Sequence, residues 1–462
     1  MEKVSKRKSI DMLNGTIWNK LPLFALPIAA TAILEQLFNA SDIAVVGNFT
    51  AAAQKTAAVA AVGANSPVIG LIVNLFVGIA LGSNVIIANA VGRDDKETIQ
   101  KTVSTSIIFS VVGGIIVAII GEIFAEPILS SLNVPSDVFP LALLYLRIYL
   151  IGLPVILLYN FEAAIFRSIG DTKVPLAALA VSGVLNVLLN LFFVIVLKMN
   201  VNGVAIATVI SNAVSSAILF FRLLKTDKNI KINLKNMRFS FSCFKRIIRI
   251  GLPAGIQSAV FSVSNIIIQS AVNSLGKVVM AASSAAFNIE IIAYYVLNSF
   301  SQACTTFVGQ NYGAGKIERC KKTLALSLVE DIIASALAIG IVLSAGRFLI
   351  SIFNRDPEVI ELGYMRLEII FASYIFSLLY EVMSGYLRGF GISLTPAILT
   401  TIGICGIRIV WINAVFPQNP TFKTIMTVYP ISLSSTAVLI FIALLICRPS
   451  KKYMNKSKGI SL

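Results

Sequence analysis

The sequence has 462 residues, of which 57% are hydrophobic and only 13% are charged. Its mean hydropathy of +0.86 is too high for a soluble globular chain, in which about 25% of residues are charged. The composition therefore indicates an integral membrane protein. Histidine is absent, and the five cysteines include no pair at metal-ligand spacing, so zinc sites and histidine-dependent nucleophiles have no support.

The apolar runs are long enough to cross a bilayer, because a helix needs about 20 mainly apolar residues to span the hydrocarbon core. Twelve such runs lie at 17–46, 57–90, 102–124, 136–166, 173–197, 203–224, 242–272, 280–311, 319–350, 358–388, 393–416 and 422–447. The sequence thus predicts an all-α integral membrane protein with twelve transmembrane helices.

Basic residues predict the orientation of these helices. The formal net charge is +16, and Lys and Arg gather in the segments between apolar runs rather than on one soluble face. The two ends and every second loop carry 29 of them, whereas the alternate loops carry six. By the positive-inside rule both termini are expected in the cytoplasm, and nucleic-acid binding is not expected.

The two halves of the chain resemble each other. "AVGRDDKE" (90–97) corresponds to "NYGAGKIE" (311–318), and "YNFEAAIFRSIGDTKVP" (159–175) corresponds to "YEVMSGYLRGFGISLTP" (380–396). Repeats of six spans predict a transporter whose two lobes are related by a pseudo-two-fold axis along the membrane normal, with the substrate site near the midplane. The expected parts are an N-terminal lobe (1–225), a cytoplasmic linker (226–241), a C-terminal lobe (242–450) and a cytoplasmic tail (451–462).

A polar stripe marks the first span. Thr31, Glu35, Asn39 and Asp42 share one helical face because they are spaced by three or four residues. An ionised acid at the bilayer centre costs roughly 2.5–3.5 kcal/mol, so an acid in this place is expected to have a function. The matching stripe of the seventh span contains Asn265 and no charge.

Partners for Asp42 are expected on the fifth and sixth spans. Asn186 and Asn190 lie one turn apart on the fifth, and Thr208 lies on the sixth. Carboxylate, amide and hydroxyl oxygens suit a hard cation or a proton-linked hydrogen-bond network. For a single Asn, however, the simpler interpretation is that it only holds two helices together.

Other polar residues are candidates for the substrate cavity. Acids in the spans are expected to attract cationic substrates, whereas Arg147, Arg366 and Arg408 can snorkel or pair with them. Pro27 removes a backbone hydrogen bond and is a candidate hinge. No role is assigned to the adjacent Glu330 and Asp331. The cavity candidates are Asn39, Glu162, Glu290, Glu381 and Gln302.

These motifs resemble the multidrug and toxic compound extrusion (MATE) transporters of bacteria. The resemblance covers almost the whole chain and rests on "LPIAATAILEQLFNASDIAVVGNF", on "FRSIGDTKVP" with "LRGFGISLTP", and on "SQACTTFVGQNYGAGK". It implies twelve helices in two lobes of six and the exchange of sodium ions or protons for organic cations.

The resemblance is closest to the DinF-like branch, whose N-terminal lobe is acidic. That branch implies a coupling ion at Asp42, which lies fifteen residues after Pro27, with Asn186 and Thr208 as partners. Asn190 stands where the branch has a second Asp, which argues against strong sodium binding and leaves Asp42 as the coupling acid. Phe261 replaces the Glu of another branch, so a sodium site in the C-terminal lobe is not expected.

The sequence therefore predicts a monomeric antiporter in the bacterial inner membrane that exports lipophilic organic cations in exchange for protons or sodium ions, without a cofactor. Glu35 is a possible proton relay or second charge, and Asp42 a possible sodium ligand. The alternative within transport is a flippase for a lipid-linked oligosaccharide, which would need a cationic cavity. A membrane enzyme lacks a recognisable nucleophile or metal motif, and a channel fits the repeat less well.

Overall fold

The computed structural model describes residues 9–50, 55–132 and 134–450. The predicted tail 451–462 and the basic residues Lys3, Lys6, Arg7 and Lys8 lie outside these ranges. Throughout the described ranges the regular structure is helical, with no strand. The first six spans are formed by α1 (Lys20–Phe49), α2 (Lys55–Gly92), α3 (Lys96–Ser131), α4 (Phe139–Ser168), α5 (Lys173–Leu191) with the π-helix η1 (Phe192–Val196), and α6 (Val201–Lys225).

The second half repeats this order with more interruptions. Its elements are α7 (Phe241–Ser274), α8 (Lys277–Gly313), α9 (Ile317–Phe353), α10 (Pro357–Ala372), α11 (Tyr374–Gly389), α12 (Leu394–Thr400), the π-helix η3 (Thr401–Gly406), α13 (Ile407–Ala414), the 3₁₀ turn η4 (Phe416–Gln418), α14 (Phe422–Met426) and α15 (Val428–Cys447). A further 3₁₀ turn, η2 (Leu234–Asn236), precedes α7.

Twelve membrane spans can be counted in the described chain, as predicted. Eleven helical segments are long and apolar enough to cross a bilayer, and the pair α10 and α11 makes a twelfth with a bend of 47°. The break at Ser373 contains neither Pro nor Gly. The Ser373 hydroxyl donates to the Ile370 carbonyl oxygen at 2.7 Å, and a side chain that inserts into the helical ladder is a known cause of a kink.

The chain forms two compact units. The N-terminal unit comprises Ala30–Ile87 and Asp95–Ile248, and the C-terminal unit comprises Met1–Ala29, Ala88–Asp94 and Arg249–Leu462. The start of α1 and the end of α2 therefore belong to the C-terminal unit, and the linker 226–241 belongs to the N-terminal unit. The boundary within α1 falls two residues after Pro27.

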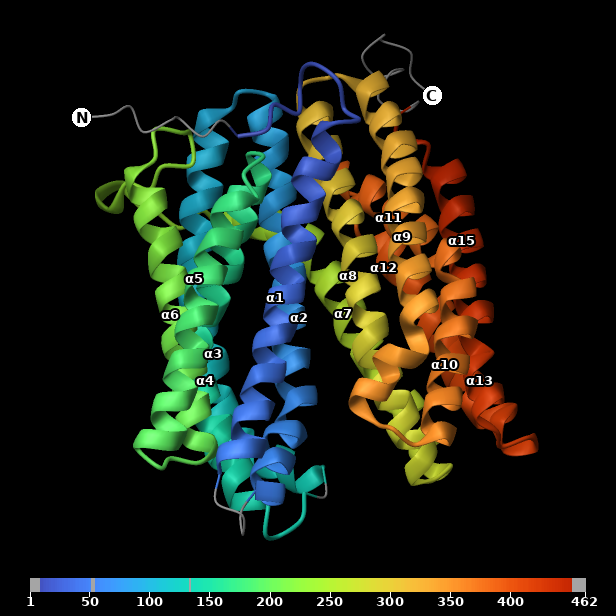
Figure 1. The fold of residues 1–462 in the computed structure, drawn as a ribbon. Coiled ribbons are helices and arrows are strands. Elements are labelled where there is room, and N and C mark those ends of the chain that lie inside the picture. Colours follow the sequence, from blue (N-terminus) through green and yellow to red (C-terminus); the bar gives the residue numbers. More distant parts are fainter. Residues whose placement is uncertain (1–8, 51–54, 133, 451–462) are drawn as a thin grey trace. The chain divides into compact units, whose positions relative to one another are not determined.

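Within the N-terminal unit, α3, α4, α5 and α6 run side by side (Figure 1). Their shared core includes Leu129, Leu146 and Val204. On the outer faces large apolar side chains are exposed, among them Ile119, Ile123, Ile151 and Val184. An apolar face of this extent suits lipid better than water.

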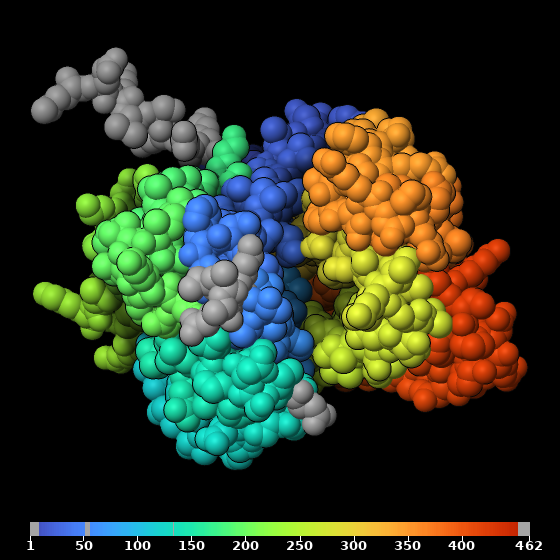
Figure 2. Space-filling model, turned by 60° about the horizontal axis from the view of Figure 1, so that its bottom comes forward, coloured from blue at the N-terminus to red at the C-terminus, as the bar shows by residue number. Residues whose placement is uncertain are grey.

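Helix α8 is the centre of the C-terminal unit, where it contacts α9, α10 and α11. A buried cluster joins Leu297 of α8 to Leu367 and Ile370 of α10. Apolar side chains such as Leu337, Ile341 and Ile446 are exposed on the outside of this unit. Helix α9 ends at Phe353 and α10 begins at Pro357, and the two helices contact each other. Residues of this part of the chain are orange in Figure 2.

The end of α2 and the end of α8, where the repeated motifs "AVGRDDKE" and "NYGAGKIE" begin, meet within the C-terminal unit. A Cβ atom at Gly92 would overlap the backbone carbonyl of Gln310, and a Cβ atom at Gly313 would overlap the backbone carbonyl of Asn89. Gly313 and Gln310 are the counterparts of Gly92 and Asn89 in the repeat. The two helix ends thus cross through a reciprocal contact between backbones, which only glycine permits.

Candidate functional sites

Asp42 lies at the centre of a buried polar network in the N-terminal unit. Its side chain is 3% exposed. The Asn190 amide donates to Asp42 Oδ1 at 2.6 Å, and the Thr208 hydroxyl donates to Asp42 Oδ2 at 2.9 Å. Asn186 joins them, because its Oδ1 accepts from Asn190 Nδ2 at 3.2 Å and its Nδ2 lies 3.4 Å from Thr208 Oγ1. The structure therefore brings together the four residues from α1, α5 and α6.

A close helix contact positions this network. The ring of Phe38 on α1 occupies the place that a side chain at position 183 of α5 would need. Gly183 therefore lets α1 and α5 approach closely. Asn186 and Asn190 follow on the same helix, and Asp42 follows Phe38 by one turn, so the polar groups meet directly beyond the apolar contact.

Asp42 has no ion-pair partner within the described ranges, and both donors to it are neutral. A buried carboxylate without a counter-charge carries a desolvation cost of several kcal/mol. Proton uptake or a bound cation removes that cost. The Oδ1 atom of Asn190 has no hydrogen-bond partner, so an amide oxygen is available beside the carboxylate for a second ligand.

The other candidates on the first span differ from Asp42 in exposure. Glu35 and Asn39 lie on α1 in the N-terminal unit and are exposed, whereas Thr31 is buried. The polar stripe thus begins and ends at buried positions, with two exposed side chains between them. Neither Glu35 nor Asn39 belongs to the hydrogen-bonded network of Asp42.

Two further cavity candidates make local hydrogen bonds. Glu162 on α4 is fully buried, and its Oε2 accepts from the Ser216 hydroxyl of α6 at 2.9 Å. Its Oε1 has no partner. Gln302 on α8 is half-buried and donates to Asn298 Oδ1 at 2.9 Å. Glu162 belongs to the N-terminal unit and Gln302 to the C-terminal unit.

Both acids predicted to attract cations in the C-terminal unit lie beside arginines. Glu290 Oε2 accepts from Arg366 Nη2 at 2.9 Å and from Nε at 3.2 Å. Glu381 Oε2 lies 3.5 Å from Arg388 Nη2. All four side chains are buried, so a guanidinium compensates the charge of each acid.

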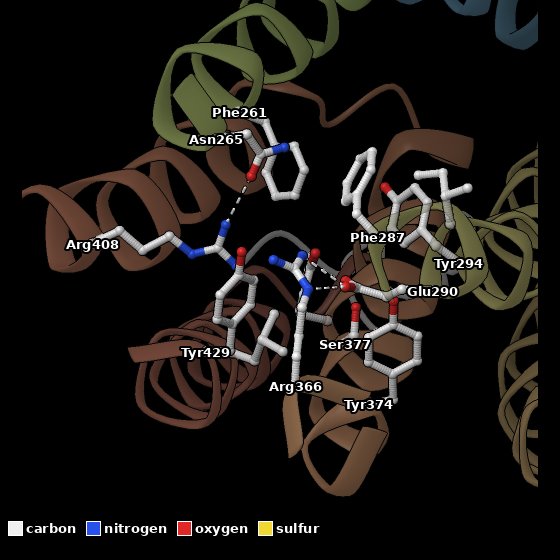
Figure 3. A pocket seen from close by; sticks show the side chains of 13 residues that line it. Phe261, Asn265, Phe287, Glu290, Tyr294, Arg366, Tyr374, Ser377, Arg408 and Tyr429 are labelled. Carbon is white, nitrogen blue, oxygen red and sulfur yellow. Dashed lines mark hydrogen bonds and ion pairs between the residues drawn. The ribbon is translucent and has the colours of Figure 1, made fainter. Parts of the chain in front are cut away.

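The Glu290 pair forms one wall of a pocket in the C-terminal unit, shown in Figure 3. The pocket holds about 530 Å³ of empty volume, counting the space open to solvent. Arg366 and Arg408 both point toward it, and the Tyr429 ring lies beside both guanidinium groups (Figure 3). The sequence showed both arginines within spans, but it gave no sign that α10 and α13 bring them to one pocket.

Glu330 and Asp331 on α9 are both buried, although adjacent residues cannot share one helical face. Asp331 Oδ1 accepts from the Ser335 hydroxyl at 3.0 Å. Both carboxylate oxygens of Glu330 and the Oδ2 atom of Asp331 have no partner in the described structure. No function follows from these contacts alone.

Comparison with known proteins identifies the chain. The profile of the MatE family matches residues 27–192 and 253–412, which covers more than half of the sequence and both repeats. The chain belongs to the MatE family of transporters. As a MATE transporter it needs no cofactor, and its substrates are small molecules that it moves across a membrane.

Individual MATE relatives agree with this assignment. The chain is 26% identical over 416 residues to "Probable multidrug resistance protein YoeA" of Bacillus subtilis, covering 88% of each chain. It is 23% identical over 313 residues to a protein named "FAD transporter" of Shewanella oneidensis, covering 66% of this chain and 69% of that one. A multidrug resistance MATE transporter solved in an outward-facing conformation shares the fold, with a TM-score of 0.87 at 21% identity, over 98% of this chain and all of that one.

Proposed function

We propose that this MATE transporter is a secondary active antiporter that exports lipophilic organic cations in exchange for protons or sodium ions, and that Asp42 couples the two movements. The observation that carries the proposal is the buried Asp42 carboxylate, which accepts hydrogen bonds from Asn190 and Thr208 and has no basic partner in the described chain. A buried carboxylate without a counter-charge is costly, so a proton or cation that binds to Asp42 stabilises the conformation in which this carboxylate is buried.

Coupling requires that substrate and ion favour different conformations. Each ligand can shift the equilibrium only by its differential affinity for the two states. In the proposed cycle, the closed network of Asp42, Asn190 and Thr208 holds a proton or a sodium ion. Opening of the network releases that ion. Pro27 lacks the amide hydrogen that would hold the helix straight, so α1 is the proposed moving element.

Recognition of the cation is proposed to involve the exposed Glu35 and Asn39 on α1, with Glu162 and Gln302 as further polar groups. Glu290 and Glu381 are paired with arginines, so neither is expected to attract a cation while its pair is intact. Glu35 supplies a negative charge outside the buried network, where a cationic compound can approach it. The network supports assignment to the DinF-like branch, because α1 supplies the acid, α5 the amides and α6 the hydroxyl, on the helices where the resemblance to that branch implies them. The protein is proposed to act as a monomer.

Export is tested with purified protein in vesicles under an imposed proton or sodium gradient. Asp42→Asn keeps the size and the hydrogen-bonding ability of the side chain but removes its charge, so the variant is expected to bind an organic cation and to lose uphill export. Asp137→Asn is the matched control, because Asp137 is an exposed acid between α3 and α4, and it should export at the unmodified rate. Uphill export by Asp42→Asn at the unmodified rate would refute the coupling role.

We also propose that both termini face the cytoplasm of a bacterial inner membrane. Four native cysteines are buried and Cys447 is half-buried, so added cysteines can be labelled against a low background. Arg93→Cys and Lys322→Cys should react with an impermeant thiol reagent only from the cytoplasmic side, and Lys277→Cys only from outside. The reverse pattern of labelling contradicts this orientation.

The second candidate is a flippase for a lipid-linked oligosaccharide. The observation in its favour is that Arg366 and Arg408 line one pocket, as binding of a diphosphate would require. The candidates separate in vesicles: a flippase moves the lipid-linked sugar between leaflets, whereas an antiporter moves a lipophilic organic cation uphill only when the ion gradient is present.

A further inference from the structure

Arg408 is a buried guanidinium without a counter-charge. Its side chain is 2% exposed, yet its hydrogen bonds in the described structure are only two long ones, from Nη1 to Asn265 Oδ1 at 3.3 Å and from Nε to Ser432 Oγ at 3.4 Å. No carboxylate forms an ion pair with it among the residues that the structure describes. The remaining N–H groups of the guanidinium therefore lack an acceptor.

The aromatic rings beside Arg408 compensate its charge only in part. The guanidinium carbon lies 4.3 Å from the centre of the Tyr429 ring and 5.4 Å from that of Phe261. A cation–π contact contributes about 2 kcal/mol when it is desolvated, less than the several kcal/mol that burial of an ion costs. Arg408 thus retains the capacity to bind an anion.

The pocket has a net positive charge because it is lined by two arginines, Arg366 and Arg408, and one acid, Glu290. Arg366 pairs with Glu290 and donates to the Ser283 hydroxyl at 2.7 Å. Its guanidinium carbon also lies 5.7 Å from the Tyr429 ring centre. Glu290 is the single acid among the lining residues, against two arginines, so the described lining carries one net positive charge, and Arg408 holds it.

The rest of the lining suits a flat apolar body. Phe261, Phe287 and Tyr294 present rings to the pocket, as Figure 3 shows, and Ile291 and Leu433 complete its apolar surface. Aromatic rings stack on one another and on guanidinium planes. An arginine fork also matches carboxylate and phosphate oxygens in a paired geometry.

We infer that this pocket binds the carboxylate or phosphate group of an aromatic compound, with Arg408 as the main anion ligand and Arg366 as its neighbour. The inference rests on the proposed export function, because it adds aromatic compounds with an acidic group to the compounds that the protein exports. Binding itself requires neither an ion gradient nor Asp42. A binding measurement can therefore fail while export stands, or succeed while the coupling proposal fails.

The test uses purified full-length protein and four probes with the same ring: 2-naphthoate, 2-naphthyl phosphate, 2-naphthalenemethanol and 2-naphthylmethylammonium. Dissociation constants are measured by calorimetry, and the shift in Tm that each probe causes is recorded. We expect at least one of the two anions to bind more tightly than the alcohol, with an affinity that depends on Arg408. The ammonium compound can bind at the proposed cation site, and its affinity should not depend on Arg408. The comparison of the two anions shows whether the pocket prefers carboxylate or phosphate.

Variants of Arg408 locate the binding. Arg408→Gln should weaken binding of the preferred anion by about 10- to 100-fold, the range expected for a lost hydrogen bond to a charged group. Arg408→Lys keeps the charge but not the fork, so its loss should be smaller. Arg347→Gln is the control, because Arg347 is an exposed arginine that pairs with Glu361 outside the pocket, and it should leave binding unchanged.

Three results would overturn the inference: equal affinity for the naphthalene anions and the alcohol, unchanged anion affinity in Arg408→Gln, and no measurable binding of either naphthalene anion. If Arg408→Gln does not fold, Arg408→Lys together with the anion-induced shift in Tm of the unmodified protein gives the answer.

Discussion

Each half of the repeat contains a buried charged group within a polar network, and the two charges have opposite sign. In the N-terminal unit Asp42 of α1 accepts hydrogen bonds from Asn190 of α5 and Thr208 of α6. In the C-terminal unit, Arg408 of α13 donates to Asn265 of α7 and Ser432 of α15. The first, fifth and sixth spans of each half contribute, but the charged residue is on the first span in the N-terminal unit and on the fifth span in the C-terminal unit.

This comparison shows how one architecture supports two kinds of chemistry. Amides and hydroxyls can donate or accept, so the neutral residues fit either sign of charge. Which ligand the network favours is then set by a single charged residue: a proton or cation beside Asp42, and an anion beside Arg408. The N-terminal bonds, at 2.6 and 2.9 Å, are also shorter than the C-terminal ones, at 3.3 and 3.4 Å.

The largest effect is expected when the C-terminal network receives the acid that it lacks. Asn265→Asp places a carboxylate where the amide oxygen now accepts from Arg408 at 3.3 Å. Because an unpaired buried charge is costly, the variant should gain on the order of 3 kcal/mol in free energy of unfolding. It should also bind 2-naphthoate more weakly, since the new carboxylate competes for the guanidinium. Thermal unfolding and calorimetry measure the two effects.

Asn273→Asp serves as the control, because Asn273 is an exposed residue of the same helix that bonds to Gln269. It should change neither quantity. If Asn265→Asp is no more stable than the unmodified protein, the charge of Arg408 is already compensated and the contrast between the units is lost.

A somewhat smaller effect is expected when the N-terminal network receives a second acid. In Asn190→Asp, two carboxylates would meet where Asn190 Nδ2 and Asp42 Oδ1 now lie 2.6 Å apart, and they need a proton or cation between them. Sodium should therefore stabilise the variant more than it stabilises the unmodified protein, by about 2.7 kcal/mol at a sodium concentration of 100 times Kd. Unfolding in sodium is compared with unfolding in potassium at equal ionic strength. Identical Tm values in the two salts would contradict a cation site at this position.

The smallest effects compare the hydroxyls of the two networks. Thr208→Val removes a donor to Asp42 while keeping the shape of the side chain, and it should cost about 1.5 kcal/mol because the acceptor is charged. Ser432→Ala removes a bond of 3.4 Å and should cost below about 0.5 kcal/mol. Chemical unfolding of both variants, with Thr208→Ser as the control that retains the hydroxyl, measures the difference. Equal losses would mean that the two networks hold their charges equally well.

Much of the architecture follows from the sequence, because apolar runs of bilayer length and their repeat predict twelve helices directly. The break at Ser373 was not predicted, since the kink depends on a hydroxyl that returns to its own helix rather than on Pro or Gly. The π-helices η1 and η3 were likewise missed. Each lies in the fifth span of its half, η1 at the end of the span after α5 and η3 in the interior of the span between α12 and α13, and no residue pattern predicted them.

The candidate sites were predictable to different degrees. Helical spacing placed Asn186 and Asn190 on one face, and the family resemblance joined them to Asp42, but only the contact of Phe38 with Gly183 explains why α1 and α5 meet there. The pairing of Glu290 with Arg366 spans 76 residues of sequence, beyond the reach of any periodicity. For the same reason no sequence pattern predicted that Arg366 would form an ion pair with an acid and that Arg408 would not.

The reciprocal contact of Gly92 and Gly313 has a consequence for how such a duplicated chain can change over time. Each glycine faces the other helix's backbone rather than a side chain. A smaller residue at one position therefore cannot make room for a larger residue at the other, because every residue has the same backbone carbonyl group. The two halves differ in charge at Asp42 and Arg408. At the crossing of α2 and α8, however, Gly92 and Gly313 must both stay glycine, because no substitution elsewhere can make room for a side chain there.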